Sequence, residues 1–441
     1  MTQVPQILGA SEQSGPRPAL DRLMPSQLHI DRRVLRNLLV GMFIINAVVL
    51  AVSWNEIMAG KNDFPPLYAS AQMVREGQAA RIYDLEAENS YVRRTSDVTR
   101  PPNNHLPYEN LIFVPFTYLQ FPQAHISWTL LSIAMLVLVA LMVCEFRADT
   151  ASFGLTLLTI LAFFPVWYCL LQGQDSILLL LLFTISFWSY RRGRHDLAGF
   201  VLALGLFRPQ LVLPFAFLMF LAGKWRFLRG FIPGVTFVVA LSAWIVGYHG
   251  MADYARILIS QGMQGSASTL VEQWHVQPSL MTTLRGLLWI SLPSSAPSFV
   301  QRFLLLAGTS FGLLWAANGV RSAKDEATLD LAFALAVVVV AVVSFHSFLH
   351  DFSLVILPVL IMGNLAPRWT RLTQSGAYAI VTVVFLLFLT PLYLVLIVSA
   401  KLGLLILPTI AGLWMAGRWG SESAGAALAP QHQTAISLPA A

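Results

Sequence analysis

The chain has 441 residues, of which 56% are hydrophobic and 11% are charged, and its formal net charge is +6. Soluble domains carry roughly 25% charged residues, so this composition excludes an ordinary soluble globular protein. The positive charge does not indicate a nucleic-acid partner, because the basic residues stand in short clusters between apolar runs and not on one basic face.

The two ends of the chain differ in composition from the rest. Residues 1–31 are rich in Pro, Gln and Ser and are predicted to form a disordered cytoplasmic tail. They do not resemble a signal peptide, because the first apolar run begins near Leu35 and is long enough to span a membrane. Residues 419–441 predict a second disordered tail of low complexity. Residues 32–418 are therefore expected to form one transmembrane domain.

Long apolar runs dominate the chain between the tails. The run Gly376–Ala400 contains no charged residue and, as a helix, would cross the roughly 30 Å hydrocarbon core of a bilayer. The pattern predicts an all-α, polytopic membrane helical bundle with about twelve segments. These lie at about residues 35–54, 126–146, 153–170, 176–190, 197–207, 210–221, 235–248, 299–320, 329–345, 352–362, 377–398 and 402–415.

Basic clusters between the apolar runs set the predicted orientation. The arginines before the first run fall on the same side as RRGR at Arg191–Arg194 and KWRFLR at Lys224–Arg229. By the positive-inside rule this side is the cytoplasm, so we expect a multi-pass protein of the cell inner (plasma) membrane with both termini cytoplasmic. Residues 55–123 and 249–297 then form long periplasmic loops, and apolar residues at helical spacing predict that the first loop is folded.

Candidate chemical groups are polar residues at the predicted outer helix ends, since no nucleotide-binding, zinc-protease or serine-hydrolase motif occurs. Asp63 follows the first span. It either caps a helix that begins at Pro65 or acts as a general base that faces a substrate in the lipid. Gln174 lies in a turn that is either an ordinary polar turn or a source of hydrogen bonds to a sugar or phosphate. Cys144 and Cys169 lie in apolar segments and are expected to serve packing alone.

A second group of candidates carries positive charge or can acquire it. Arg208 interrupts an apolar pair of short segments at Arg208-Pro209, where we predict a partly re-entrant hairpin. Its guanidinium either snorkels to the membrane surface or binds a phosphate. His346 and His350 are four residues apart beside Asp351; without a third ligand they are weak evidence for zinc. They are either ordinary interfacial histidines or groups that bind a phosphate or orient a carboxylate.

The candidates share one location, the outer ends of several predicted helices. A channel is typically lined by rings of like residues, and a transporter typically has polar breaks near the midplane in two matching halves. The sequence shows no internal repeat. We therefore favour an outward-facing enzymatic pocket. Two alternatives stay open, a flippase or transporter of lipid-linked sugars and a non-catalytic membrane scaffold.

A set of motifs follows in a fixed order along about residues 35–370. The set consists of Asp63, Tyr68, Ala69, Gly77, Ile82-Tyr83-Asp84, Tyr108, Leu111, Pro115, Gly173-Gln174, Arg191–Arg194, the segment Ala198–Pro209 and the late aromatic–His end. This order resembles that of a known family, glycosyltransferase family 87 (DUF2029) of polyprenol-phosphate-dependent mannosyltransferases. This chain has Arg208 where members often have lysine, and it has Glu109 and Asn110 where paired prolines are expected.

The resemblance implies a GT-C fold and an inverting hexosyltransferase. Its donor would be a mannose-like sugar on a polyprenyl phosphate, and its acceptor a lipid or glycan. The family's catalytic aspartate corresponds to Asp63, which would deprotonate the acceptor hydroxyl. We expect the donor phosphate to contact Arg208 and His350, and the substrate to contact Tyr68, Gln174 and His346. Membrane lipids are further partners. No cofactor is expected and no motif indicates a metal, although some GT-C enzymes use one.

Overall fold

The computed structural model describes residues 32–96, 105–146, 153–262, 278–293, 295–365 and 373–427. Every regular element in these ranges is a helix, which confirms the all-α fold class. Residues 1–31, the first predicted tail, lie outside the described ranges. The α-helices are α1 (Arg32–Met58), α2 (Phe64–Arg75), α3 (Leu85–Val92), α4 (Asn110–Phe113), α5 (Phe121–Glu145), α6 (Phe153–Ala162), α7 (Phe164–Gln172), α8 (Ser176–Arg191), α9 (His195–Ala203), α10 (Pro209–Leu221), α11 (Trp225–Gly262), α13 (Leu284–Ser291), α14 (Ser298–Ser322), α15 (Glu326–Val343), α16 (Ile356–Leu365), α17 (Gln374–Phe388), α18 (Thr390–Val398) and α19 (Ile406–Ala427).

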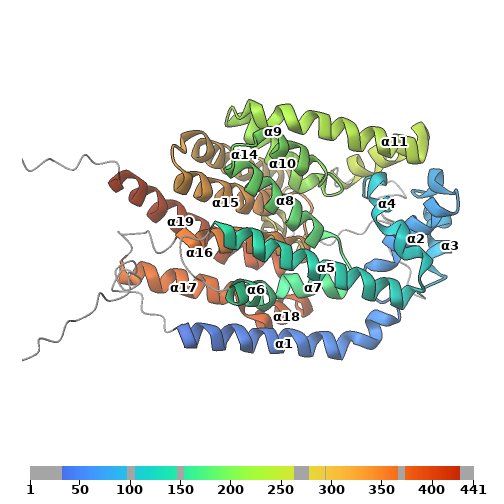
Figure 1. Ribbon diagram of the computed structural model, residues 1–441, viewed down its shortest axis with the longest axis horizontal. Helices are drawn as coiled ribbons and strands as arrows, with labels where there is room; N and C mark the ends of the chain where they lie inside the picture. Colours follow the sequence, from blue (N-terminus) through green and yellow to red (C-terminus); the bar gives the residue numbers. More distant parts are fainter. Residues whose placement is uncertain are drawn as a thin grey trace, which may run out of the picture.

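Short 3₁₀ turns connect several of these helices. They are η2 (Ala79–Arg81), η3 (Pro107–Glu109), η4 (Val114–Tyr118), η5 (Pro278–Leu280), η6 (Asp351–Val355) and η8 (Leu402–Leu405). In Figure 1 the long helices lie side by side, and α2, α3 and α4 gather at one end of the bundle. The start of α1 and the end of α19 lie at the opposite end (Figure 1).

Among the described residues, five helices are long and apolar enough to cross a membrane: α1, α5, α11, α14 and α15. The count rises to seven if α6 with α7 and α17 with α18 each form one bent span. Four further apolar helices are shorter, at Ser176–Arg191, Pro209–Leu221, Asp351–Leu365 and Leu402–Arg418. The chain is therefore a helical membrane protein, and the prediction of about twelve membrane segments stays a prediction.

Two predicted straight helices are bent in the structure. The segment expected to be one helix over 153–170 turns by 67° between α6 and α7, and the one expected over 377–398 turns by 56° between α17 and α18. In each case a proline, Pro165 or Pro391, occupies the first turn of the second helix, where its missing N–H costs least. The apolar composition continues across both bends, so hydropathy alone does not reveal them.

A buried asparagine in α1, Asn46, makes hydrogen bonds at both bends. The Asn46 side-chain amide donates to the carbonyl of Ala162, at 3.2 Å, where the end of α6 leaves that oxygen without a helical partner. Its carbonyl oxygen accepts a 2.7 Å hydrogen bond from the hydroxyl of Thr390, which begins α18. The Asn46 side chain thus makes hydrogen bonds at both bends, to the last residue of α6 and to the first residue of α18.

The predicted break at Arg208-Pro209 is confirmed, because α9 ends at Ala203 and α10 begins at Pro209. The next helix is longer than predicted. α11 begins at Trp225, ten residues before the expected start at 235, and continues to Gly262 through a break in helical geometry at Gly247 (φ 71°). Cys144 and Cys169 are free thiols, as expected.

Helices α9 and α11 approach each other closely at glycines. A Cβ atom on Gly199 would lie 1.9 Å from the Phe227 carbonyl oxygen, and one on Gly230 would lie 1.8 Å from the Asp196 carbonyl oxygen. Gly230 and Gly234 form a G-x-x-x-G spacing, which permits backbones to meet in membrane helices. This contact fixes α9, and with it the turn that carries Arg208.

Gly230→Ala is expected to destabilise the protein by about 1–3 kcal/mol, because the added methyl group meets backbone atoms that can move only if α9 and α11 separate. The thermal melting midpoint of the purified protein measures this loss. Gly319→Ala is the matched control, because its Cβ would meet no atom within 4 Å. Equal midpoints for the two variants would contradict the close packing.

Candidate active site

Four charged residues stand at the start of helices and lie close together. Asp63 precedes α2, Asp175 precedes α8, Arg208 precedes α10, and Asp351 opens η6 before α16. In each case a short connection separates two helices, so the charge falls where one helix has ended and the next begins. The N-terminal ends of helices carry partial positive charge, which favours the three carboxylates at these positions.

A buried ion pair forms the centre of the cluster. The Nε of Arg208 donates to Asp175 Oδ1 at 2.9 Å, and its Nη2 contacts the same oxygen. Asp351 Oδ1 lies 3.7 Å from Arg208 Nε. All three side chains are at most 5% exposed. Removing one member of such a buried pair costs about 3–5 kcal/mol, because the other charge is left uncompensated.

Gln174 connects the ion pair to Asp63. Its side-chain oxygen accepts a hydrogen bond from Arg208 Nη2, and its amide nitrogen donates to Asp63 Oδ2 at 3.2 Å. The backbone N–H of Asp63 donates to the side-chain oxygen of Gln172 at 3.1 Å. Gln172 and Gln174, at the junction of α7 and α8, therefore both hold Asp63 in position.

His350 approaches the cluster from the α15–η6 connection. Its Nε2 lies 3.4 Å from Arg208 Nη1 and 3.6 Å from Asp351 Oδ2. Asp351 accepts a 2.8 Å hydrogen bond from the hydroxyl of Ser176 and a 3.3 Å bond from that of Ser347. Burial, the largest effect, lowers the pKa of His350, so its imidazole is neutral near neutral pH.

The structure thus brings together four of the six residues singled out from the sequence: Asp63, Gln174, Arg208 and His350. Tyr68 lies apart from this network, since its hydroxyl donates to the Leu119 carbonyl at 2.7 Å. His346 is buried against Phe348, with 4.9 Å between the ring centroids. Their predicted substrate contacts stay predictions.

Asp63 occupies the cap position of α2, but its side chain does not cap the helix. No capping hydrogen bond reaches its carboxylate; instead Asn62 Oδ1 accepts from the Phe64 N–H at 3.1 Å. The helix begins at Phe64, one residue before the expected Pro65. The carboxylate of Asp63 is half-buried, whereas those of Asp175 and Asp351 are buried.

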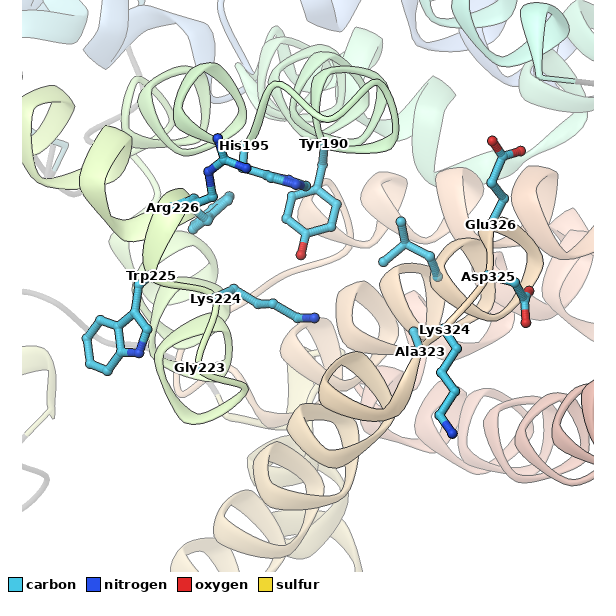
Figure 2. A pocket seen from close by; sticks show the side chains of 12 residues that line it. Tyr190, His195, Gly223, Lys224, Trp225, Arg226, Ala323, Lys324, Asp325 and Glu326 are labelled. Carbon is cyan, nitrogen blue, oxygen red and sulfur yellow. The ribbon is translucent and has the colours of Figure 1, made fainter.

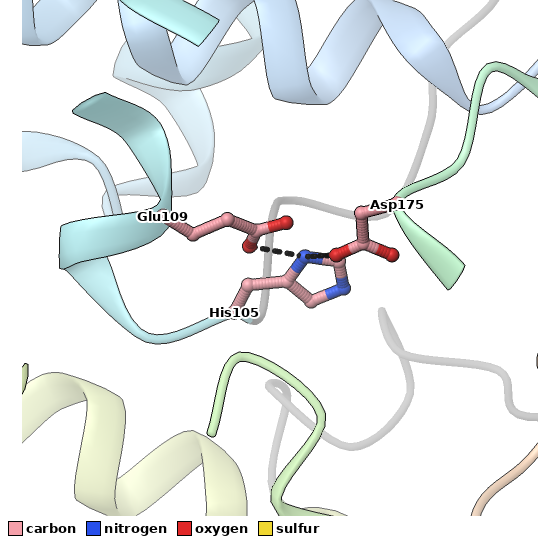
Figure 3. Close-up of side chains that lie close together, drawn as sticks. All are labelled: His105, Glu109 and Asp175. Carbon is pink, nitrogen blue, oxygen red and sulfur yellow. Dashed lines mark ion pairs between the residues drawn. The ribbon is translucent and has the colours of Figure 1, made fainter. Parts of the chain in front are cut away.

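Sequence reasoning missed a second group of titratable residues beside the ion pair. Figure 3 shows His105, Glu109 and Asp175 with their side chains turned toward one another. His105 Nδ1 lies 2.6 Å from Glu109 Oε2 and 3.4 Å from Asp175 Oδ2. Asp175 therefore faces Arg208 with one oxygen and His105 with the other. The local signal was present in HLPYE, where His105 and Glu109 are four residues apart across Pro107.

The electrostatics of the two neighbouring acids differ. Burial is the largest single effect and opposes ionisation of Asp175, but Arg208, His105 and Glu109 together outweigh it, and the net effect lowers the pKa of Asp175. Burial, reinforced by the Asp175 carboxylate, raises the pKa of Glu109 well above its usual range. Burial also lowers the pKa of His105 to about 3, so this imidazole is neutral.

The cavity shown in Figure 2, about 560 Å³, lies away from this cluster. Its lining residues include Tyr190, Gly223 and Asp325, next to the C-terminal ends of α8 and α10 and the N-terminal end of α15. The cluster lies at the other ends of the same three helices. Along α8 alone the separation is roughly 20 Å at 1.5 Å per residue. The cavity and the charged cluster are therefore separate places in the fold.

The family model of glycosyltransferase family 87 matches residues 107–345, more than half of the chain. The chain belongs to glycosyltransferase family 87. Searches of curated proteins and of solved structures gave no match. Membership makes the protein a membrane glycosyltransferase, which acts on a sugar donor and an acceptor. Gln174 and Arg208 lie within the matched residues of the family; Asp63 and His350 lie outside them and join the site through the contacts described above.

In this glycosyltransferase, Tyr108 fixes the turn that presents Arg208. Its hydroxyl donates to the Leu204 carbonyl at 2.7 Å and accepts from the Phe207 N–H at 3.1 Å. Its own N–H donates to the Ser242 hydroxyl in α11 at 3.1 Å. Tyr108 is therefore a positioning residue that links the segment carrying His105 and Glu109 to the Arg208 turn.

Tyr108→Phe is expected to lower both the melting midpoint and the glycosyl transfer rate. The change leaves the part-buried Leu204 carbonyl and the buried Phe207 N–H without their hydroxyl partner, and an unsatisfied buried group costs about 1–3 kcal/mol. The exposed Tyr248→Phe serves as the control. If both variants melt and react like the unmodified protein, the hydroxyl of Tyr108 does not hold the turn.

The stability of the protein is expected to decrease as the pH falls from about 6.5 toward 4. Burial lowers the pKa of His346 to about 4, whereas an unfolded histidine titrates near 6.5. The unfolded chain therefore binds a proton that the folded site rejects, which costs at most about 3 kcal/mol. Melting midpoints measured between pH 7 and pH 4.5 should fall less steeply for His346→Gln. The exposed His249→Gln should keep the original slope, and identical slopes for all three proteins would refute this assignment.

Proposed function

We propose that the protein transfers a hexose, mannose-like, from a polyprenyl-phosphate donor to a lipid or glycan acceptor on the periplasmic side of the inner membrane, with inversion at the sugar carbon. The observation that carries the proposal is the half-buried Asp63 carboxylate, joined through Gln174 to the buried Arg208 guanidinium. A potential base and a potential phosphate-binding group are thus held one side chain apart, at the start of separate helices.

Asp63 takes the role of general base. It is the most accessible of the cluster's aspartates, and its carboxylate is not used as a helix cap. It removes the proton from the acceptor hydroxyl as that oxygen bonds to the anomeric carbon. The bond from this carbon to the donor phosphate oxygen breaks, and the polyprenyl phosphate leaves with the electron pair. Attack opposite to the departing phosphate inverts the sugar carbon.

Arg208 and His350 stabilise the departing phosphate. A guanidinium has five N–H donors in a planar fork suited to phosphate oxygens. Two of its nitrogens contact Asp175, while Nη1 faces His350. A phosphate oxygen can replace the neutral Gln174 oxygen at Nη2 without separating the Arg208–Asp175 pair. The N-terminal ends of α8 and α10 add partial positive charge at the same place.

The proposed sidedness follows from the distribution of basic residues along the bundle. Arg191, at the end of α8, pairs with Glu326 and Asp330 at the start of α15, each at 3.0 Å. This end carries the basic clusters expected in the cytoplasm. The charged cluster lies at the opposite ends of α8 and α15, which we assign to the periplasm. Substrate then reaches Asp63 from the membrane or from the periplasmic side.

Asp63→Asn is expected to reduce sugar transfer by about 10²–10⁴-fold, the usual contribution of a general base. The assay follows radiolabelled mannose from a polyprenyl phosphate into lipid and glycan products of purified protein in vesicles. Asp253→Asn, which alters an exposed acid paired with Arg256, is the control and should retain full activity.

Three outcomes would oppose the proposal. Full transfer by Asp63→Asn would remove Asp63 from the mechanism. Movement of intact donor across the vesicle membrane, without transfer and without dependence on Asp63, would instead support a flippase. Wild-type levels of transfer and donor movement in a triple variant of Asp63, Arg208 and His350 would indicate that these residues have no part in either process, as a scaffold requires.

A further inference from the structure

The group formed by His105, Glu109 and Asp175 has the composition of a cation site. Each residue offers one ligand atom, and these atoms lie within 4.8 Å of one another. The three side chains come from the segment before η3, from its last residue, and from the turn between α7 and α8. Figure 3 shows them converging on a common space.

The Glu109 side chain is buried without hydrogen bonds from the described residues. Its exposed fraction is 0%, and within the described residues neither carboxylate oxygen accepts a hydrogen bond from an N–H or hydroxyl group. His105 Nδ1 lies 2.6 Å from Glu109 Oε2, the distance of an ion pair. Asp175 Oδ2 also lacks a hydrogen-bond partner among the described residues, although Asp175 Oδ1 accepts a hydrogen bond from Arg208. A carboxylate this deeply buried is costly unless a proton or a cation compensates it.

The charges of the buried cluster do not balance. Arg208 contributes one positive charge. With Glu109 protonated, Asp175 and Asp351 leave one negative charge (two minus one), and with Glu109 ionised two remain (three minus one). Buried charges are normally paired or coordinate a metal. A divalent cation between Glu109 and Asp175 would neutralise the excess while Arg208 retains its place.

We propose that His105, Glu109 and Asp175 bind a small divalent cation of the Mn²⁺ type. One imidazole nitrogen and two carboxylate oxygens form a mixed set of nitrogen and oxygen ligands, which suits such ions better than Ca²⁺. The separations of 2.6 and 3.4 Å between ligand atoms are compatible with a shared centre at bonds of about 2.0–2.2 Å. Small inward shifts of the side chains would complete the coordination.

The protonation of the three groups is compatible with this site. A ligating histidine must be neutral, and the lowered pKa of His105 keeps it so. The raised pKa of Glu109 identifies a proton as the competitor of the cation. Asp175 would divide its carboxylate between the cation and Arg208, so the bound ion would help to hold the guanidinium in position. Cation binding itself does not depend on the proposed transfer reaction.

Titration of the purified full-length protein in detergent with Mn²⁺, followed by electron paramagnetic resonance without donor or acceptor, tests the proposal. We expect one saturable site per chain. Glu109→Gln should weaken its affinity at least about tenfold, since even residues that only support metal ligands have effects of this size. Glu88→Gln is the matched control. It changes another buried glutamate, which accepts a 2.8 Å hydrogen bond from Ser70, and it should bind Mn²⁺ as the unmodified protein does.

A second measurement keeps the test decisive if Glu109→Gln fails to fold. Pulsed spectra of Mn²⁺ bound to the unmodified protein should show coupling to the ¹⁴N nucleus of the His105 imidazole, and His105→Gln should lose it. Absence of a saturable site, absence of this coupling, or equal affinity in folded Glu109→Gln would overturn the proposal. All readouts are independent of sugar transfer, so they succeed or fail separately from the assignment of Asp63.

Discussion

The charged cluster of this glycosyltransferase, its proposed site, depends on one buried guanidinium. Arg208 binds Asp175 through two nitrogens, approaches Asp351 and His350, and holds Gln174, which in turn holds Asp63. These partners come from different parts of the chain, so a single side chain sets the relative positions of α2, α8, α10 and the η6–α16 segment. The ion pair adds less to stability than its geometry suggests, because desolvation of both charges is costly. Its main effect is to allow few alternative arrangements of the helix ends.

Much of this arrangement was predictable from the sequence. The break before α10 followed from Arg208-Pro209, because proline cannot continue a regular helix. The common location of Asp63, Gln174, Arg208 and His350 followed from orienting the apolar runs by their basic ends. The bends between α6 and α7 and between α17 and α18 were missed, since the residues on both sides are equally apolar. Their geometry depends on the long-range hydrogen bonds of Asn46, which no local pattern reports.

The contact of His105 and Glu109 with Asp175 was not predictable in the same way. Glu109 drew notice only because it stands where the family pattern has proline, and His105 lies in a segment without clear periodicity. Their contact with Asp175 joins residues 66 to 70 positions apart in the sequence, and it depends on Tyr108, which ties this segment to the turn before Arg208. A sequence shows which residues could bind a cation, but only the packing of α8, α9 and α11 shows that three of them meet.

The different environments of the carboxylates explain why one of them is suited to catalysis. Asp175 is ionised but engaged with Arg208, Asp351 accepts hydrogen bonds from two serine hydroxyls, and Glu109 is held toward its protonated form by burial. A base must meet its substrate's proton within hydrogen-bond distance, which these buried groups cannot do without rearrangement of the helix ends. Asp63 is half-buried at the edge of the same network. The buried carboxylates therefore serve to position, and the accessible carboxylate beside them is the one that we propose reacts.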